Sequence, residues 1–230
     1  MRSLAPIIVA ALFGLQVSAQ TTYYTLLFSL ASAGSQYGVT SFESTMIAPA
    51  VSTGSGSHSA WPGLEPESES FVYQNVLIDS GNHWYFFTEY CCSPNVDYAP
   101  QLTYPGDSIK SVFDLDTSTG EWTNTWSRTP GSTGSAAGET AGATVSTNSF
   151  PSENILSQAV FAIELQNSAA WDFGAVVWSD ITITANTTDT TWCTSPETFG
   201  SFQYSMSSPV ATVSGSSSTC FVASLIFENP

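Results

Sequence analysis

Glu164 is the residue of this sequence whose surroundings most suggest chemistry. It lies in the segment 159–165, in which all six remaining residues are apolar, as is typical of a buried β-strand. A carboxylate in such a segment must be paired, hydrogen-bonded or protonated, because an isolated buried charge is very costly. Carboxyl groups in such surroundings often act as acids or bases. The alternative is that the pleat turns Glu164 to solvent, on one face with Ala162 and Gln166.

The second group of candidates is aromatic. The segment 83–87, His-Trp-Tyr-Phe-Phe, is too aromatic for a strand with one solvated face, so both of its faces must meet apolar material. One face would pack in the core and the other could line a cleft. Other tryptophans could contribute to such a cleft, with ordinary core packing as the alternative for each of them: Trp61, Trp122, Trp126 and Trp178.

The elements that would position these residues are strands. Segments rich in β-branched and aromatic residues alternate with turn signals such as 79–82 and 105–107. Beyond the N-terminal apolar run, no stretch of helical length has an apolar stripe. We therefore predict an all-β fold, a two-sheet antiparallel β-sandwich or jelly roll. The predicted strands are 23–30, 41–47, 71–78, 83–90, 108–116, 123–128, 158–166, 174–183, 210–214 and 221–227.

One domain accounts for the chain after its first residues. A basic start, an apolar run over 4–15 and the small residues 17–19 predict a signal peptide over 1–19. We therefore expect a secreted, extracellular protein whose single β-sandwich domain spans 20–230 and which works as a monomer. Two low-complexity segments, 51–59 and 130–148, are predicted to be long flexible loops within that domain.

The charge balance is strongly acidic. The chain has 3 Lys and Arg residues against 19 Asp and Glu residues, with a net charge of −16. So little positive charge argues against nucleic acid and anionic membranes as partners. Repulsion among the carboxylates would diminish near pH 3–4, which favours an acidic working environment. The alternative is that the charge serves only solubility.

The four cysteines indicate disulfides, since the chain is predicted to be secreted. We favour a bridge between Cys193 and Cys220, with Cys91 and Cys92 either bridged to each other or free. Asn186 begins a glycosylation sequon.

No metal site or cofactor is expected, because no Cys/His cluster has zinc spacing. A Ser/His/Asp site is not expected either. His58 lies in a Ser/Gly-rich segment and His83 at the start of a predicted strand, and no Gly-x-Ser-x-Gly turn precedes a helix.

Several segments, in order, resemble the fungal glutamic peptidases, the eqolisins. The order and approximate spacing agree over roughly 41–185. The matching segments are Ala-Trp-Pro-Gly-Leu-Glu at 60–65, Phe-Val-Tyr-Gln-Asn-Val-Leu at 71–77, His-Trp-Tyr at 83–85, Pro-Gly-Asp-Ser-Ile at 105–109, the apolar strand 159–165 and Asp-Phe-Gly at 172–174.

The resemblance implies a concanavalin A-like β-sandwich whose active site lies on a concave sheet. It places Gln74 at the position of the family's catalytic glutamine and Glu164 at that of its glutamate. The glutamate would activate a water for attack on a peptide carbonyl, and the glutamine amide would stabilise the oxyanion. We therefore expect an acid-acting endopeptidase in which Gln74 and Glu164 lie within hydrogen-bond or one-water reach.

Two other functions remain open from the sequence. A non-catalytic carbohydrate-binding module would stack sugars on Trp61, Trp84 and Trp178 and accept hydroxyl hydrogen bonds at Glu65 and Glu164. A glycan-cleaving enzyme would need two carboxylates about 5–9 Å apart, and Glu65 with Glu164 is the pair we nominate. In a peptidase, Trp61, Glu65 and Trp84 are the candidate substrate-binding residues. A secreted interaction protein without chemistry is a further possibility.

Overall fold

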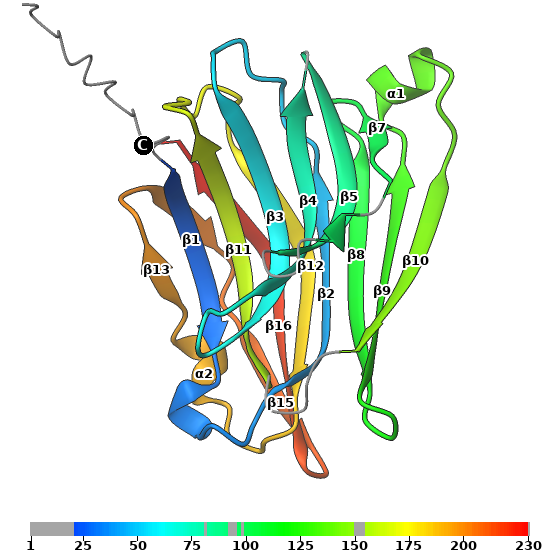
Figure 1. Cartoon of the computed structure of the whole chain (residues 1–230). Coiled ribbons are helices and arrows are strands. Elements are labelled where there is room, and N and C mark those ends of the chain that lie inside the picture. The colour runs from blue at the N-terminus through cyan, green and yellow to red at the C-terminus, as the bar shows by residue number, and fades with distance from the viewer. Residues whose placement is uncertain (1–20, 81, 92–95, 98, 150–154, 230) are drawn as a thin grey trace, which may run out of the picture.

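Two antiparallel β-sheets face each other in the computed structural model, which describes residues 21–80, 82–91, 96, 97, 99–149 and 155–229 (Figure 1). This confirms the predicted β-sandwich. Sheet A has the order β13 (Glu197–Phe199), β1 (Thr22–Ser29), β11 (Leu156–Gln166), β3 (Ser57–Pro66), β4 (Val72–Ser80), β5 (His83–Cys91) and β6 (Val96–Asp97), with β7 (Gln101–Thr103) also paired to β5.

Sheet B forms the second layer, behind sheet A in Figure 1. Its order is β10 (Gly142–Ser149), β9 (Glu121–Thr129), β8 (Ser108–Asp116), β2 (Val39–Ile47), β12 (Val176–Ala185), β16 (Ser217–Glu228) and β14 (Gln203–Met206), with β15 (Val210–Ser214) also paired to β16. The described helices are short: η1 (Ala31–Ala33), α1 (Ser132–Ala136) and α2 (Thr191–Thr194). None of the helices described is long and apolar enough to cross a membrane.

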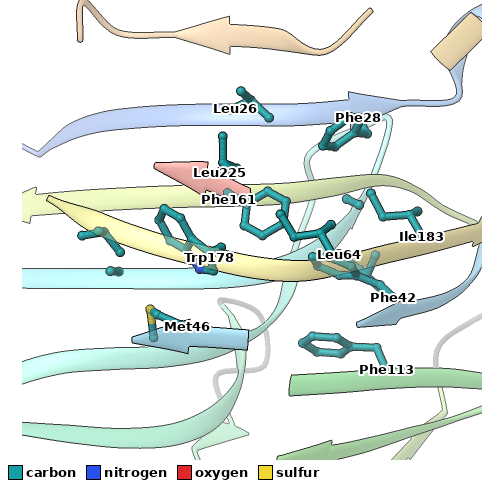
Figure 2. Packing of buried hydrophobic residues seen from close by; sticks show 14 of the residues in the cluster. Leu26, Phe28, Phe42, Met46, Leu64, Phe113, Phe161, Trp178, Ile183 and Leu225 are labelled. Atoms are coloured by element: carbon teal, nitrogen blue, oxygen red, sulfur yellow. The ribbon is translucent and has the colours of Figure 1, made fainter. Parts of the chain in front are cut away.

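The core lies between the two layers and is rich in aromatic side chains (Figure 2). Phe161 of sheet A meets Phe42 and Trp178 of sheet B edge to face, with ring centroids 5.4 Å apart in both pairs. Edge-to-face contacts of this kind stabilise a core beyond the area that they bury. Most of the buried aromatic side chains therefore lie in the core between the two sheets.

One polar contact also joins the sheets through the core. Asn75 of β4 and Asn124 of β9 are fully buried. Each side-chain amide donates to the other's oxygen, at 3.0 and 2.8 Å, and the Thr88 hydroxyl also donates to Asn75 Oδ1 at 2.9 Å. Because buried amides are costly when unpaired, this pair helps to set how the two sheets face each other.

All ten predicted strands are present, but the two predicted loops are partly wrong. Strand β3 begins at Ser57 and runs through Pro62 in the middle of sheet A. The pairing of β3 with β4 joins Ala60 to Leu77 and resumes at Gly63 with Gln74, which accommodates a proline without an N–H. The second loop contains α1 and β10, which lies at the edge of sheet B and, among the described strands, pairs with β9 alone.

The disulfide between Cys193 and Cys220 is present, as predicted. Cys91 is also disulfide-bonded, which excludes a free thiol at this position, whereas Cys92 lies outside the described residues. The signal-peptide region 1–19 also lies outside them. Asn186 is exposed, and its Oδ1 accepts a hydrogen bond from the Gly38 N–H at 2.7 Å; its glycosylation stays a prediction.

Candidate active site

A cleft of about 570 Å³ opens on the face of sheet A that points away from sheet B. Strand alternation produces this face: in β1, Leu26 and Phe28 enter the core, whereas Tyr23 and Leu27 line the cleft. The lining residues come from β1, β3, β4, β5, β11, β13 and adjoining segments. They are Thr21, Tyr23, Thr25, Leu27, Trp61, Glu65, Glu69, Val72, Gln74, Glu89, Cys91, Gln158, Glu164, Gln166 and Phe199.

An apolar patch separates two polar ends of the cleft. It is a buried cluster on the outer face of sheet A, distinct from the main core, made of Leu27, Trp61, Val76, Val160 and Ala162. Trp61 is 6% exposed and also lines the cleft. Trp61 thus belongs to the apolar patch between the two polar ends of the cleft. That Trp61 contacts the substrate stays a prediction.

One polar end, which we call the acid–amide cluster, comprises Glu65, Gln74, Glu89 and Gln158. Gln158 of β11 lies directly opposite Glu65 of β3, and Glu89 of β5 lies directly opposite Gln74 of β4. Gln74 pairs with Gly63, two residues before Glu65, so Glu65 and Gln74 are diagonal neighbours with Cα atoms about 8 Å apart. The four side chains come from four adjacent strands and line one cleft.

Burial changes the acidity of Glu65. Desolvation, and secondarily the nearby charge of Glu69, raise the pKa of the Glu65 carboxyl from 4.5 to about 7. Both influences disfavour the ionised form. A carboxyl group with such a pKa exchanges its proton near neutral pH, which suits a general acid or base.

Gln74 is held in one orientation by its neighbours. Its Nε2 donates to Glu89 Oε2 at 3.0 Å, while its Oε1 is buried without a hydrogen-bond partner. Gly63 permits this close packing, because a Cβ at position 63 would lie 3.0 Å from the Gln74 Cβ. The amide keeps one N–H that the Glu89 bond does not use.

Glu164 lies at the other polar end of the cleft. Its Oε1 accepts hydrogen bonds from the Tyr23 hydroxyl at 3.1 Å and from Gln166 Nε2 at 2.6 Å. Burial, together with the Glu164 charge, raises the pKa of Tyr23 to about 12. Glu164 does face away from the core, as the pleat alternative required, but it lines a cleft rather than open surface.

Gln74 and Glu164 share this cleft but do not meet. Gln74 pairs with Gly63 and Gly63 with Val160, which is four residues from Glu164 along β11. Two strand spacings and four residues place the two Cα atoms about 16 Å apart. Their side chains bond to neighbours on opposite sides, Glu89 and Tyr23. The expectation that this pair lies within hydrogen-bond or one-water reach is therefore wrong.

The other predicted pair is also separated. Glu65 lies opposite Gln158, six residues from Glu164 on β11, so their Cα atoms are about 20 Å apart. The charge of Glu65 nevertheless acts on Tyr23, whose hydroxyl binds Glu164, so a glycan-cleaving role for this pair stays a prediction.

Two of the tryptophans considered as sugar platforms are core residues. Trp84 and Trp178 are fully buried between the sheets. The indole N–H of Trp84 lies within hydrogen-bond reach of the Pro49 and Ala50 carbonyls, at 3.1 and 3.2 Å. The prediction that Trp84 binds substrate is therefore wrong, and the reason is that its face of β5 turns toward sheet B.

Sequence reasoning missed two members of the acid–amide cluster, Glu89 and Gln158. Each ends up on the cleft face by simple alternation: Glu89 stands two residues before Cys91 on β5, and Gln158 six residues before Glu164 on β11. A face assignment for the predicted strands could have found both. The pairing of the strands, which brings them together, was not readable from the sequence.

His58 is buried outside this cleft, where its side chain connects two other segments of the chain. It is fully buried on β3, with Nδ1 2.9 Å from Asp79 Oδ2 and Nε2 3.2 Å from Ser52 Oγ. Ser52 is only 4% exposed and its Oγ also accepts the Gly54 N–H. Ser52, His58 and Asp79 are the residue types of a serine-hydrolase triad. The Ser52 hydroxyl is buried, however, so a substrate could not reach it as a nucleophile. These hydrogen bonds instead connect separate segments of the fold. No metal-binding group of His, Cys, Asp or Glu occurs among the described residues.

Comparisons with known proteins agree on the fold. Two crystal structures of scytalido-glutamic peptidase, one with a transition-state analogue inhibitor and one with a peptide-based analogue, superpose with a TM-score of 0.52 at 16% identity, covering 90% of this chain and 100% of theirs. SCP-B, an eqolisin-family peptidase in complex with the tripeptide Ala-Ile-His, gives a TM-score of 0.48 at 14% identity, with 90% and 100% coverage. No family model and no curated protein matches the sequence. At 16% identity, the similarity to scytalido-glutamic peptidase establishes a shared β-sandwich fold and no more.

Proposed function

We propose that the protein is a secreted hydrolase that binds an extended polypeptide in the sheet A cleft and cleaves one of its peptide bonds. The observation that carries the proposal is the position of Glu65 and Gln74 in one cleft, on neighbouring strands, with the pKa of Glu65 raised to about 7. The fold that it shares with a glutamic peptidase crystallised with transition-state analogues adds support. The N-terminal signal-peptide pattern supports secretion.

In this mechanism Glu65 is the general base and then the general acid. The ionised carboxylate takes a proton from a water molecule, whose oxygen attacks the carbonyl carbon of the scissile bond. The C–N bond then breaks, and Glu65 returns the proton to the leaving amine. The amide N–H of Gln74 that does not contact Glu89 donates to the oxyanion as negative charge develops.

Glu89 is assigned a positioning role. Its carboxylate accepts the Gln74 Nε2–H at 3.0 Å, which fixes the rotation of the amide before substrate binds. A preoriented donor stabilises a transition state without reorganisation during the reaction. Val160 occupies the place across Gly63 from Gln74, so no carboxylate faces Gln74 from β11 at that level.

The pH dependence separates this proposal from the one that the sequence suggested. If Glu65 is the base, the rate must rise with pH through about 7, because the protonated carboxyl cannot accept a proton. Activity at about pH 2–4, expected for an acid peptidase, would require a base other than Glu65.

The decisive experiment measures cleavage of a denatured, fluorescently labelled protein from pH 2 to 9, with an aspartic-peptidase inhibitor present. We expect Glu65→Gln to abolish cleavage and Gln74→Ala to lower the rate about 10²–10³-fold, the usual effect of losing one oxyanion donor. Glu164→Gln is the matched control and should retain the wild-type rate at pH 7. Loss of activity in Glu164→Gln with full activity in Glu65→Gln would assign the base to Glu164 and refute this mechanism.

A further inference from the structure

The side chains that line the cleft carry several negative charges and no positive charge. Four glutamates line it, Glu65, Glu69, Glu89 and Glu164, and none of its lining residues is a lysine or arginine. The two cations in the described part of the chain lie on sheet B and are already paired, Lys110 with Glu43 and Arg128 with Glu139, each at 2.7 Å. The negative charge of the cleft is thus left without a cation from those residues.

A second observation points to a missing donor at the acid–amide cluster. Gln74 and Gln158 are 4% and 8% exposed, and the Oε1 atom of each is buried without a hydrogen-bond partner. The two side chains lie on either side of Glu65, on β4 and β11. Buried amide oxygens are nearly always satisfied in proteins, so two in one cleft indicate a ligand that donates several hydrogen bonds.

We propose that the acid–amide cluster is a specificity subsite for a cationic side chain, arginine or lysine, of the bound polypeptide. The inference rests on the proposed function, because it takes the ligand to be a polypeptide. A guanidinium carries five N–H donors and no acceptor, and an ammonium carries three donors. Either group would donate to the two orphaned amide oxygens and place a positive charge beside Glu65, whose carboxylate stays available to the water; the planar guanidinium is better suited to several acceptors at once.

Binding of a cation at this subsite must be coupled to proton release. In the free protein, burial and the charge of Glu69 keep Glu65 protonated up to a pKa of about 7. Glu89 on β5, Tyr23 on β1 and, farther off, Glu164 on β11 are the other titratable side chains of this cleft. A cation beside Glu65 favours its ionised form and lowers that pKa, so a peptide that binds near pH 6 displaces a proton.

Isothermal titration calorimetry tests the inference directly. Acetylated, amidated alanine hexapeptides carrying one arginine, one lysine or one citrulline are titrated at pH 6 in two buffers of different ionisation enthalpy. Citrulline keeps the shape of arginine without its charge. We expect the arginine peptide to bind at least tenfold more tightly than the citrulline peptide, the ratio given by one charge-assisted hydrogen bond, and to release a proton. Glu65→Gln should remove the proton release, and Glu164→Gln should leave it intact.

The outcomes separate this inference from the proposed function, provided that mass spectrometry shows the peptides intact. Preference for arginine with proton release, in a protein that cleaves nothing, supports the subsite and rejects the hydrolase. Equal affinity for arginine and citrulline, or the same proton release in Glu65→Gln, overturns the subsite, whether or not the protein cleaves polypeptides.

Discussion

Replacing Glu65 by glutamine should change how the stability of the fold depends on pH. Below pH 4.5, Glu65 is neutral in both the folded and the unfolded chain and costs nothing. Between pH 4.5 and about 7, the unfolded chain ionises while the folded chain keeps its proton, because burial raises the folded pKa to about 7. The stability contributed by the neutral form is therefore lost as the pH rises through about 7.

The size of this loss follows from the two pKa values. At about 1.4 kcal/mol for each pH unit, the interval from 4.5 to about 7 corresponds to about 3 kcal/mol. Because water reaches part of the Glu65 side chain and screens its charge, we expect a loss of about 2 kcal/mol. Glutamine has nearly the same shape and stays neutral, so the variant should not show this loss.

Urea unfolding at pH 4, 5, 6, 7 and 8 measures the effect as the difference between wild type and Glu65→Gln. The variant should gain about 2–3 kcal/mol relative to wild type between pH 4 and pH 8, with an unchanged m-value. Glu121→Gln, at an exposed glutamate on sheet B, is the matched control and should run parallel to wild type. Parallel profiles for Glu65→Gln as well would show that Glu65 ionises normally, which would remove the basis of the proposed mechanism.

Three further sets of substitutions test the contacts that hold the two sheets and their connecting segments together. Asn124→Leu should lower the free energy of unfolding by about 1–3 kcal/mol, because it leaves the Asn75 amide nitrogen without its acceptor in the core. In urea unfolding, the Asn75→Leu, Asn124→Leu double variant should lose less than the sum of the two single losses, and simple additivity would contradict a direct pair. The Cys193–Cys220 bridge closes a loop of 27 residues. The double variant Cys193→Ser, Cys220→Ser should therefore have a free energy of unfolding lower by about 3.5 kcal/mol, from the loop-entropy relation. An unchanged melting curve would refute this. His58→Ala should lower the free energy of unfolding by about 1–3 kcal/mol, because it removes the ring's hydrogen bonds to Asp79 Oδ2 and Ser52 Oγ. Limited proteolysis should then cut the segment around Ser52 faster than in wild type, and an unchanged cleavage rate would contradict the role of His58 in holding this segment.

The sequence predicted the strands well because their signals are local. β-branched and aromatic residues alternate with Gly, Pro, Asn and Asp turns, and each of the ten predicted strands lies within or overlaps an observed one. β3 was missed because Pro62 and Gly63 are poor strand residues. Sheet A tolerates them there: the ladder to β4 resumes at Gly63, and this glycine leaves room for Gln74.

The candidate site shows the limit of sequence reasoning more sharply. Alternation correctly places Gln74 and Glu164 on one face of sheet A. It cannot give the strand pairing, and a displacement by any even number of residues preserves the face while moving the side chain about 6.6 Å for each two residues. Here the displacement is four residues: Val160, not Glu164, stands at the level of Gln74. Long-range register decides which carboxyl groups can act together.

The two acidic ends of the cleft also make a prediction about ligand length. Glu65 and Glu164 face the same way and lie six strand residues apart, about 20 Å. An extended peptide lying along the strands rises about 3.3 Å per residue, so cationic side chains at positions i and i+6 would reach both ends, with alanines over the apolar patch. At i and i+5 the two side chains point to opposite faces of the peptide.

Arg-(Ala)5-Arg should therefore bind more tightly than Arg-(Ala)4-Arg, both acetylated and amidated. A partly exposed ion pair contributes about 0.2–1 kcal/mol, so we expect about a 1.4- to fivefold difference in Kd by calorimetry at low salt. Glu164→Gln should abolish the difference without weakening Arg-(Ala)4-Arg, since only the second arginine depends on Glu164. Equal affinities in the wild-type protein would show that the bound chain crosses the strands or contacts one end alone, and the two glutamates would then belong to separate sites.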